Sequence, residues 1–311
     1  DGYLFDQLDI KVIYGLLTHF PHPQLNQVPE LHYLHALLLR RTGQPQQAIQ
    51  LLEKAKAAYT ATQQFDGVVC CCLELAYIAQ LQEDFDTADR YLRGEIQPLI
   101  DRQWVKDASL QAHFFLGMAN YAYVRREYQR ALTYAQQALL LYTSQGYGYG
   151  QLLARLRLAV TSIPLGDYQE AEHQFEEAKE QVTSGKLGAL AEAHVLRAQL
   201  MLEWYRRELT AACQTAQQYL TLADAEPYSN DRIYARLMLG NLYRDLGEFS
   251  TAHDWYVATS DVIEQVGAQH YWPYLNAELA WLYLLEGRLH QARALLHTQQ
   301  INAQQKQIMH R

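Results

Sequence analysis

A small residue that recurs at a fixed interval constrains the fold of this chain more than any other feature of its sequence. An alanine returns seven times, at intervals of 40 to 43 residues, and twelve positions before it stands another small residue in every copy but one, which has Leu200. Small residues at this spacing allow two antiparallel helices to approach closely and interlock. The repeat predicts an all-α fold of about seven helical hairpins, each about 40 residues long. The alanines are Ala48, Ala88, Ala131, Ala171, Ala212, Ala252 and Ala292.

The turn inside each hairpin is expected five positions before this alanine. Four of the seven turn positions hold glycine, which reaches the left-handed conformation that ends a helix without strain. The other three hold Glu83, Arg126 and Arg207. There we expect either the same turn at an energetic cost or a different turn geometry. The glycines are Gly43, Gly166, Gly247 and Gly287.

The prolines agree with this division into helices. Pro29, Pro45 and Pro273 fall at expected helix starts, where a missing N–H costs little, and Pro164 falls at an expected helix end. Pro98 does not fit, because together with Gly94 it predicts that the second helix of the second hairpin ends early or kinks.

The ends of the array and one internal loop can also be assigned. Residues 1–28 are predicted to form a capping helix or the end of a preceding repeat, and residues 29–311 a single continuous array. The segment 299–311 is expected to be a fraying final helix. The glycine-rich loop 146–150 lacks the Lys-Ser/Thr of a phosphate-binding loop, so we interpret it as a flexible linker between two hairpins.

Composition narrows the functional classes. The formal net charge of -8 disfavours direct nucleic-acid contact by this segment, since phosphate contacts need clustered Lys and Arg. No apolar run is long enough to span a membrane, and no signal peptide is visible. Neighbouring cysteines such as Cys70, Cys71 and Cys72 cannot pair with one another on a helix, which favours reduced thiols in a cytoplasmic protein.

No residue cluster predicts catalysis, a metal or a cofactor. The histidine pairs at 19 and 22 and at 32 and 35 have no Asp, Glu or Cys that completes a ligand set. Cys213 has no neighbouring base, and the acidic stretch 170–180 is interpreted as a solvated helix face. We therefore expect a protein that is not an enzyme.

The pattern of small and aromatic residues resembles the tetratricopeptide repeat (TPR), most closely in the sixth hairpin. The residues at the family's signature positions there are Leu239, Gly240, Tyr243, Gly247, Phe249 and Ala252. The resemblance implies a right-handed α–α superhelix, although a period near 40 departs from the family's usual 34 residues. Residues 16–55 are further similar to the start of the sensor arrays of MalT-like, LuxR-type transcription activators, which are signal-transduction ATPases with numerous domains.

In that group an ATPase module precedes the array and a DNA-binding helix-turn-helix follows it. No G-x-x-x-x-G-K-[ST] motif occurs in this sequence. The resemblance therefore implies a ligand-sensing segment whose partner is a protein, a peptide or a small-molecule inducer, with the regulatory output carried elsewhere. The alternative is a scaffold or adaptor that binds a peptide or helix without a switching role.

A ligand is expected on the concave side, which the first helices of the hairpins line. Their inward positions mix aromatic, arginine and amide side chains, which can stack on a ligand and hold its polar groups. Packing between helices explains part of the same set equally well. Leu116 stands where a carboxylate-clamp lysine would be, which argues against that mode of binding. The candidate binding residues are Tyr77, His113, Asn120, Tyr123, Arg157, Arg197, Met201, Trp204, Tyr234, Asn241, Arg244 and Trp281.

Overall fold

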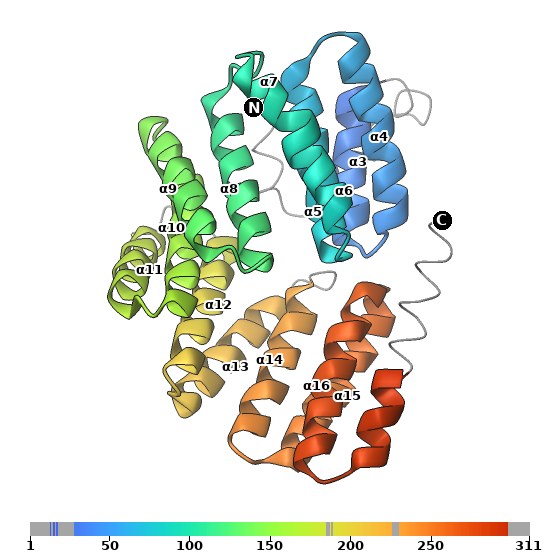
Figure 1. Ribbon diagram of the computed structural model, residues 1–311, viewed down its shortest axis with the longest axis vertical. Helices are drawn as coiled ribbons and strands as arrows, with labels where there is room; N and C mark the ends of the chain where they lie inside the picture. Colours follow the sequence, from blue (N-terminus) through green and yellow to red (C-terminus); the bar gives the residue numbers. More distant parts are fainter. Residues whose placement is uncertain are drawn as a thin grey trace. The chain divides into compact units, whose positions relative to one another are not determined.

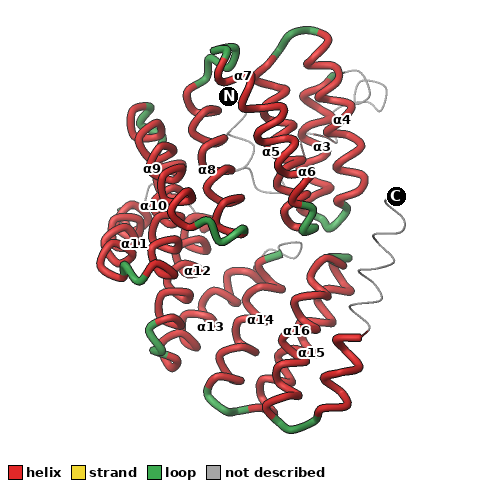
Figure 2. The backbone as a smooth tube through the Cα atoms, in the orientation of Figure 1, coloured by secondary structure: helices red, strands yellow, loops and turns green. Residues whose placement is uncertain are grey.

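The computed structural model describes residues 13, 15, 17, 28–184, 187, 189–225 and 230–297 (Figures 1 and 2). All the regular secondary structure of these residues is helical, which confirms the all-α prediction. The chain divides into two compact units, Asp1–Leu202 and Glu203–Arg311, which we call unit 1 and unit 2.

Unit 1 contains the first four hairpins. Successive helices lie beside one another, with the chain reversing direction at each turn (Figure 1). Hairpin one is α3 (Pro29–Arg41) and α4 (Pro45–Ala61). Hairpin two is α5 (Phe65–Leu81), followed by α6 (Phe85–Asp89), the π-helix η2 (Arg90–Ile96) and α7 (Gln97–Asp101). Hairpin three is α8 (Ala108–Val124) and α9 (Tyr128–Ser144), and hairpin four is α10 (Gly148–Ser162), the short η3 (Ile163–Leu165) and α11 (Tyr168–Thr183).

Helix α12 (Ala189–Tyr205) begins in unit 1 and ends in unit 2. Unit 2 continues with α13 (Leu209–Ala225), then α14 (Asp231–Asp245) and α15 (Phe249–Val266), which form hairpin six. A short η4 (Gln269–Tyr271) leads into α16 (Trp272–Leu285), and residues 289–297 are again helical. Helices α12 and α13 thus form the fifth hairpin. Leu200, which stands there in place of a small residue, is fully buried.

The alanines that defined the repeat lie at the centre of the helix packing. All seven are at most 1% exposed. Around them, glycines make room for tyrosine rings: a Cβ added at Gly240 would lie 2.4 Å from the ring of Tyr256, and one added at Gly150 would lie 2.4 Å from the ring of Tyr142. The sequence register is therefore confirmed by burial as well as by the helix bounds.

The seven predicted turn positions all adopt the left-handed conformation. The glycines have φ between 75° and 84°, while Glu83, Arg126 and Arg207 have φ of 58°, 62° and 62°. The next residue closes each turn by donating to a carbonyl five residues back, as Glu127 N does to Ala122 O at 2.8 Å. The three non-glycine positions therefore adopt the same turn as the glycines, not a different turn geometry.

The interpretation of residues 146–150 as a flexible linker was wrong. Helix α10 already begins at Gly148, and Gly150 is buried in its first turn. The reason is the Tyr142 ring, which occupies the space beside Gly150 and fixes the start of the helix against α9.

The prolines lie where the sequence placed them. Pro29 and Pro45 begin α3 and α4, Pro273 is the second residue of α16, and Pro164 lies in η3 just after α10. The interruption expected around Gly94 and Pro98 takes the form of the π-helix η2, after which the helix resumes as α7.

Some expectations concern residues outside the described part of the chain. These are the pair His19 and His22, the tail 299–311, and the proposed cap 1–28 apart from residues 13, 15, 17 and 28. Of these four, Ile13 and Leu17 are buried against Leu31 and Leu34 of α3.

Candidate functional site

Three side-chain pairs join successive first helices at the same repeat positions. In each pair, the residue four places after the small residue of one hairpin contacts the residue two places before the small residue of the next. The partners are 34 residues apart in all three cases. The pairs are Arg40 with Glu74, Tyr123 with Arg157, and Arg244 with Glu278.

In hairpins one and two, the pair is a short ion pair with an aromatic neighbour. Arg40 Nε lies 2.7 Å from Glu74 Oε2, and Glu74 is only 6% exposed. The Arg40 guanidinium also stacks over the ring of Tyr77, 5.0 Å from its centroid. Tyr77 is a predicted binding residue and is 40% exposed. Its ring therefore contacts the Arg40 guanidinium and is also accessible from solvent.

In hairpins three and four, three predicted residues come together. The Arg157 guanidinium lies 4.9 Å from the centroid of the Tyr123 ring, a cation–π contact between α10 and α8. Asn120 lies one helical turn before Tyr123 on the same face of α8. Its Oδ1 is buried and accepts no hydrogen bond from the described residues. A buried acceptor without a donor is unfavourable by about 1–3 kcal/mol, so this amide would gain from a donor brought by a ligand.

His113 lies further toward the start of α8 and has a structural partner. Its Nδ1 is 3.2 Å from the hydroxyl of Tyr142, a fully buried residue of α9. This contact ties the two helices of hairpin three together, rather than joining His113 to the group around Tyr123.

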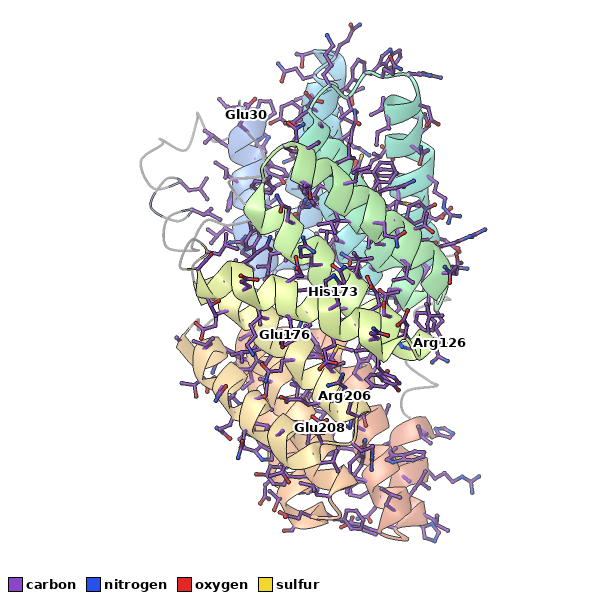
Figure 3. The ribbon with its side chains drawn as sticks, turned by 90° about the vertical axis from the view of Figure 1, so that its left-hand side faces the viewer. Glu30, Arg126, His173, Glu176, Arg206 and Glu208 are labelled. Atoms are coloured by element: carbon purple, nitrogen blue, oxygen red, sulfur yellow. The ribbon has the colours of Figure 1, made fainter. Side chains whose placement is uncertain are left out.

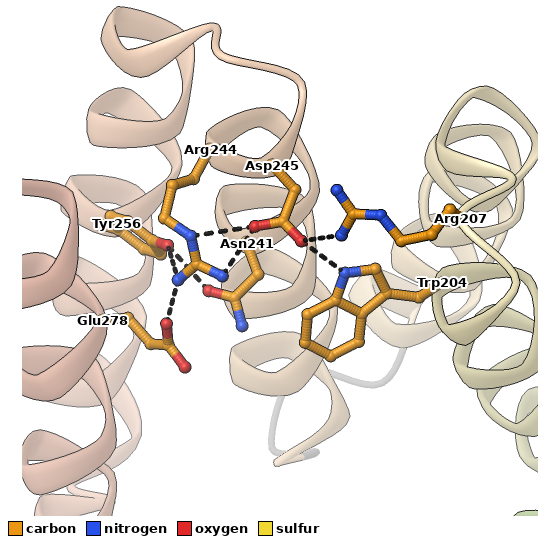
Figure 4. A network of polar contacts seen from close by, with 7 residues as sticks. All are labelled: Trp204, Arg207, Asn241, Arg244, Asp245, Tyr256 and Glu278. Atoms are coloured by element: carbon orange, nitrogen blue, oxygen red, sulfur yellow. Dashed lines mark hydrogen bonds and ion pairs between the residues drawn. The ribbon is translucent and has the colours of Figure 1, made fainter. Parts of the chain in front are cut away.

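In unit 2, a polar network contains three more predicted residues, Trp204, Asn241 and Arg244 (Figure 4). Its centre is Asp245, at the end of α14. Asp245 Oδ2 accepts from Trp204 Nε1 at 2.9 Å and from Arg207 Nη1 at 3.0 Å. Its Oδ1 accepts from Arg244 Nε at 3.2 Å and from Arg244 Nη2 at 3.0 Å.

These donors determine the protonation of Asp245. Burial alone would raise the pKa of its carboxyl group. The hydrogen bonds from Trp204 and Arg244 and the charges of Arg244 and Arg207 outweigh burial, and they hold the pKa below its ordinary value. Asp245 is therefore a stable anion that fixes the Trp204 indole.

Arg244 and Asn241 are buried inside the same network. Arg244 Nη1 donates to Glu278 on α16 and lies 3.4 Å from the hydroxyl of Tyr256. That hydroxyl donates to Asn241 Oδ1 at 2.7 Å. Asn241 and Arg244 are 4% and 8% exposed. In this structure they hold α14 against α15 and α16, and a ligand that reached them would have to displace these partners.

The remaining predicted residues lie on α12, α14 and α16. Arg197 and Met201 are half-buried on α12, and Tyr234 is half-buried against Tyr219, with ring centroids 6.2 Å apart. Trp281 is 55% exposed on α16. Four partners were not among the predicted residues: Glu74, Asp245, Tyr256 and Glu278. Pairs of complementary charges at an offset of 34 residues would have identified the two glutamates.

A surface hollow of about 350 Å³ is found elsewhere, along α11. Figure 3 labels two of its lining residues, His173 and Glu176. None of the predicted binding residues lines it, and its carboxylates belong to the acidic face 170–180 already interpreted as solvated.

The described residues contain no group of three or more His, Cys, Asp and Glu side chains arranged to hold a metal ion. Burial raises the pKa of the Cys71, Cys72 and Cys213 thiols, which makes them poorer nucleophiles. Within the same residues, every helix is too short or too polar to traverse a bilayer.

The tetratricopeptide repeat profile matches residues 29–60, which comprise most of hairpin one. No curated protein sequence matches the chain. Among solved structures, a Rap protein complexed with competence and sporulation factor superposes with a TM-score of 0.68 at 12% identity, covering 99% of this chain and 97% of that one. The fold is TPR-like.

Two further structures share this fold. The Rap conjugation gene regulator of plasmid pLS20, in complex with the Phr* peptide, has a TM-score of 0.66 at 16% identity, covering 83% of this chain and 69% of that one. A STAND (signal transduction ATPase with numerous domains) protein from Pyrococcus horikoshii, with a TPR sensor, has a TM-score of 0.50 at 15% identity. That match covers 90% of this chain and 43% of the STAND protein.

Proposed function

We propose that this protein binds a peptide or an extended protein segment on the first helices of its hairpins. The observation that carries the proposal is the group formed by Asn120, Tyr123 and Arg157, in which two adjacent first helices present an amide, an aromatic ring and a guanidinium together. An asparagine amide offers both a donor and an acceptor, which match the C=O and N–H of one peptide unit. Turning the amide about its last bond would bring the unsatisfied oxygen to the ligand.

The related fold of the pLS20 Rap regulator supports this reading, because that structure contains the Phr* peptide. The stacked Tyr123 and Arg157 would then contact a ligand side chain beside the peptide unit held by Asn120. Within unit 1, we extend the proposal to the predicted residue Tyr77, which is 40% exposed. Trp281 of unit 2, 55% exposed, is proposed as a contact residue on its own.

We further propose that the module is the sensor of a cytoplasmic MalT-like regulator, responding to a regulatory protein or an inducer. The TPR sensor of the Pyrococcus STAND protein supports this finer assignment. In that case a cap at 1–28 and a continuous array at 29–311 would relay occupancy to an ATPase, without direct contact between this segment and nucleic acid. A scaffold that binds a peptide or helix is the second candidate. Walker motifs and a helix-turn-helix encoded beside this segment in the same gene favour the regulator, and other neighbours favour the scaffold.

The test uses random dodecapeptides displayed on phage and selected against the whole chain. Peptides enriched on the wild type should bind Asn120→Ala at least about tenfold more weakly, because a buried hydrogen-bond pair is lost. Since Asn120 Oδ1 is a buried acceptor with no donor among the described residues, the same variant should melt at or above the wild-type temperature.

The matched control is Gln129→Ala, which removes an exposed amide from α9. It should bind the selected peptides as the wild type does. Failure to enrich any peptide, or equal affinity of Asn120→Ala and wild type, would overturn the proposed site.

A further inference from the structure

Two consecutive residues at the end of α14 contact opposite neighbours in unit 2 (Figure 4). Asp245 binds Trp204 and Arg207, at the end of α12 and in the turn that follows it. Arg244 binds Glu278 on α16. We propose that Arg244 and Asp245 form a relay that couples the end of α12 to α16, so that a displacement of the Trp204 indole is transmitted across α14. The relay concerns unit 2 alone and does not rest on the proposed peptide site in unit 1.

The relay is continuous because its two halves are bonded to each other. Both Arg244 Nε and Arg244 Nη2 donate to Asp245 Oδ1, leaving Oδ2 for Trp204 and Arg207. Charge-assisted hydrogen bonds of this kind are roughly twice as strong as neutral ones. The Arg244 and Asp245 side chains are 8% and 16% exposed, so water screens their interaction only weakly.

The surroundings of Arg244 restrict how it can respond. The hydroxyl of Tyr256 lies 3.4 Å from Arg244 Nη1 and is itself fixed by Asn241. The Tyr256 ring lies in the space left by Gly240. A buried guanidinium that loses one carboxylate becomes an uncompensated charge, which is strongly unfavourable. The Arg244 side chain cannot rotate freely. A change at Asp245 therefore alters the contact between Arg244 and Glu278.

The Arg40–Glu74 pair of hairpins one and two is an equivalent ion pair without a relay. Arg40 and Glu74 occupy the same repeat positions as Arg244 and Glu278, but the residue after Arg40 is Arg41, which cannot accept hydrogen bonds from donors of a neighbouring helix. The first pair joins two first helices. The Arg244–Asp245 sequence joins three, with the partly exposed Trp204 at one end and α16 at the other.

A double-mutant cycle on the whole chain tests the relay by amide hydrogen exchange in α16. Trp204→Phe keeps the aromatic ring and removes the Nε1 donor, whereas Glu278→Gln keeps the side-chain shape and removes the charge. No direct contact joins the two residues, so independent effects would multiply. We expect Trp204→Phe alone to speed exchange in α16 several-fold, and to add much less in the Glu278→Gln background.

Two further variants keep the result interpretable. Arg207→Gln removes a second donor to Asp245 Oδ2 from a side chain that is 64% exposed, so it should speed α16 exchange without disturbing packing. Asp224→Asn weakens the ion pairs with Arg232 and Arg236 elsewhere in unit 2, and its effect should multiply with that of Glu278→Gln. Unchanged α16 exchange in both Trp204→Phe and Arg207→Gln, or fold-changes that multiply in the cycle, would overturn the relay. Neither result bears on peptide binding at Asn120.

Discussion

Single glycines decide how closely the helices of this protein pack. Gly240 and Gly150 each lie against a fully buried tyrosine, Tyr256 and Tyr142, with room for the ring only because no Cβ is present. The Tyr256 hydroxyl donates to Asn241 on α14, the helix that carries Gly240, whereas the Tyr142 hydroxyl contacts His113 on α8 rather than α10. In both cases the missing Cβ allows a large buried ring whose hydroxyl reaches a polar side chain.

Gly240→Ala should destabilise the protein by about 1–3 kcal/mol, since the added methyl overlaps the Tyr256 ring and forces it to move. Urea denaturation monitored by circular dichroism measures the change. The matched control is Gly148→Ala, in the first turn of α10, where a Cβ meets nothing within 4 Å. There alanine should be neutral or slightly stabilising. A larger loss in the control than at Gly240 would contradict this account of the packing.

Asp245 predicts a pH dependence with a definite sign. Its pKa is lower in the folded protein than in the unfolded chain, so its contribution is fully present above the unfolded pKa and is lost as pH falls through the folded pKa. The difference in unfolding free energy between wild type and Asp245→Asn should therefore be constant near neutral pH and shrink below about pH 4. Denaturation curves from pH 7 to pH 3 measure it. A difference that grows on acidification would be incompatible with the contacts described here.

At the scale of helices and turns, repetition is what the sequence reveals best. The buried alanines and the left-handed turn positions recur at equivalent places, so an alignment of the chain with itself finds them. The contacts between first helices are different, because Arg40 meets Glu74 and Arg244 meets Glu278 at an offset of 34 residues while the hairpins repeat at about 40. Partners therefore fall in different columns of such an alignment.

Local chemistry was also insufficient to separate binding residues from packing residues. Arg244 and Tyr77 both occupy first-helix positions predicted to face a ligand, yet Arg244 is buried with three polar partners and Tyr77 is 40% exposed. That difference depends on which side chains the adjacent helices supply. The start of α10 at Gly148 was missed for the same reason, because the Tyr142 ring that fixes it belongs to another helix.

Glycine in place of a non-glycine residue at a left-handed turn position should increase the stability of the protein. Arg126 has a φ of 62°, a conformation that is unfavourable by about 1–2 kcal/mol for a residue with a Cβ. Arg126→Gly should therefore stabilise the protein, by less than this amount because glycine also increases the entropy of the unfolded chain. Thermal unfolding measures the gain. Gln136→Gly, at an exposed position inside α9, should instead lose about 1 kcal/mol. Equal losses at both positions would contradict the turn assignment.

At the scale of the whole molecule, the chain divides into two compact units, whereas we propose that residues 29–311 form one continuous array. In stacked repeats, stability is shared between nearest neighbours, so damage to one hairpin weakens the next. A variant that disrupts a single hairpin shows how far this coupling extends along the chain.

Ala252→Glu places a charge at a fully buried position of α15 and should cost several kcal/mol. A continuous array predicts that hydrogen exchange then increases in α10 and α11 as well as in unit 2. The control is Ser250→Glu, at an exposed position of the same helix, which should leave stability nearly unchanged. Wild-type stability in Ala252→Glu would refute the repeat register, and exchange unchanged throughout α10 and α11 would refute the single domain.

The constant offset between the paired first helices bears on how such a chain can evolve. In each of the three pairs, one hairpin supplies the residue four places after its small residue and the next hairpin supplies the residue two places before its own. A gene rearrangement that set hairpin one in front of hairpin seven would present Arg40 to Glu278 in the geometry that Arg40 now has with Glu74. Hairpins that carry the arginine or the glutamate of such a pair can therefore be exchanged with one another. Hairpins three and four, which are joined by Tyr123 and Arg157, fit only each other.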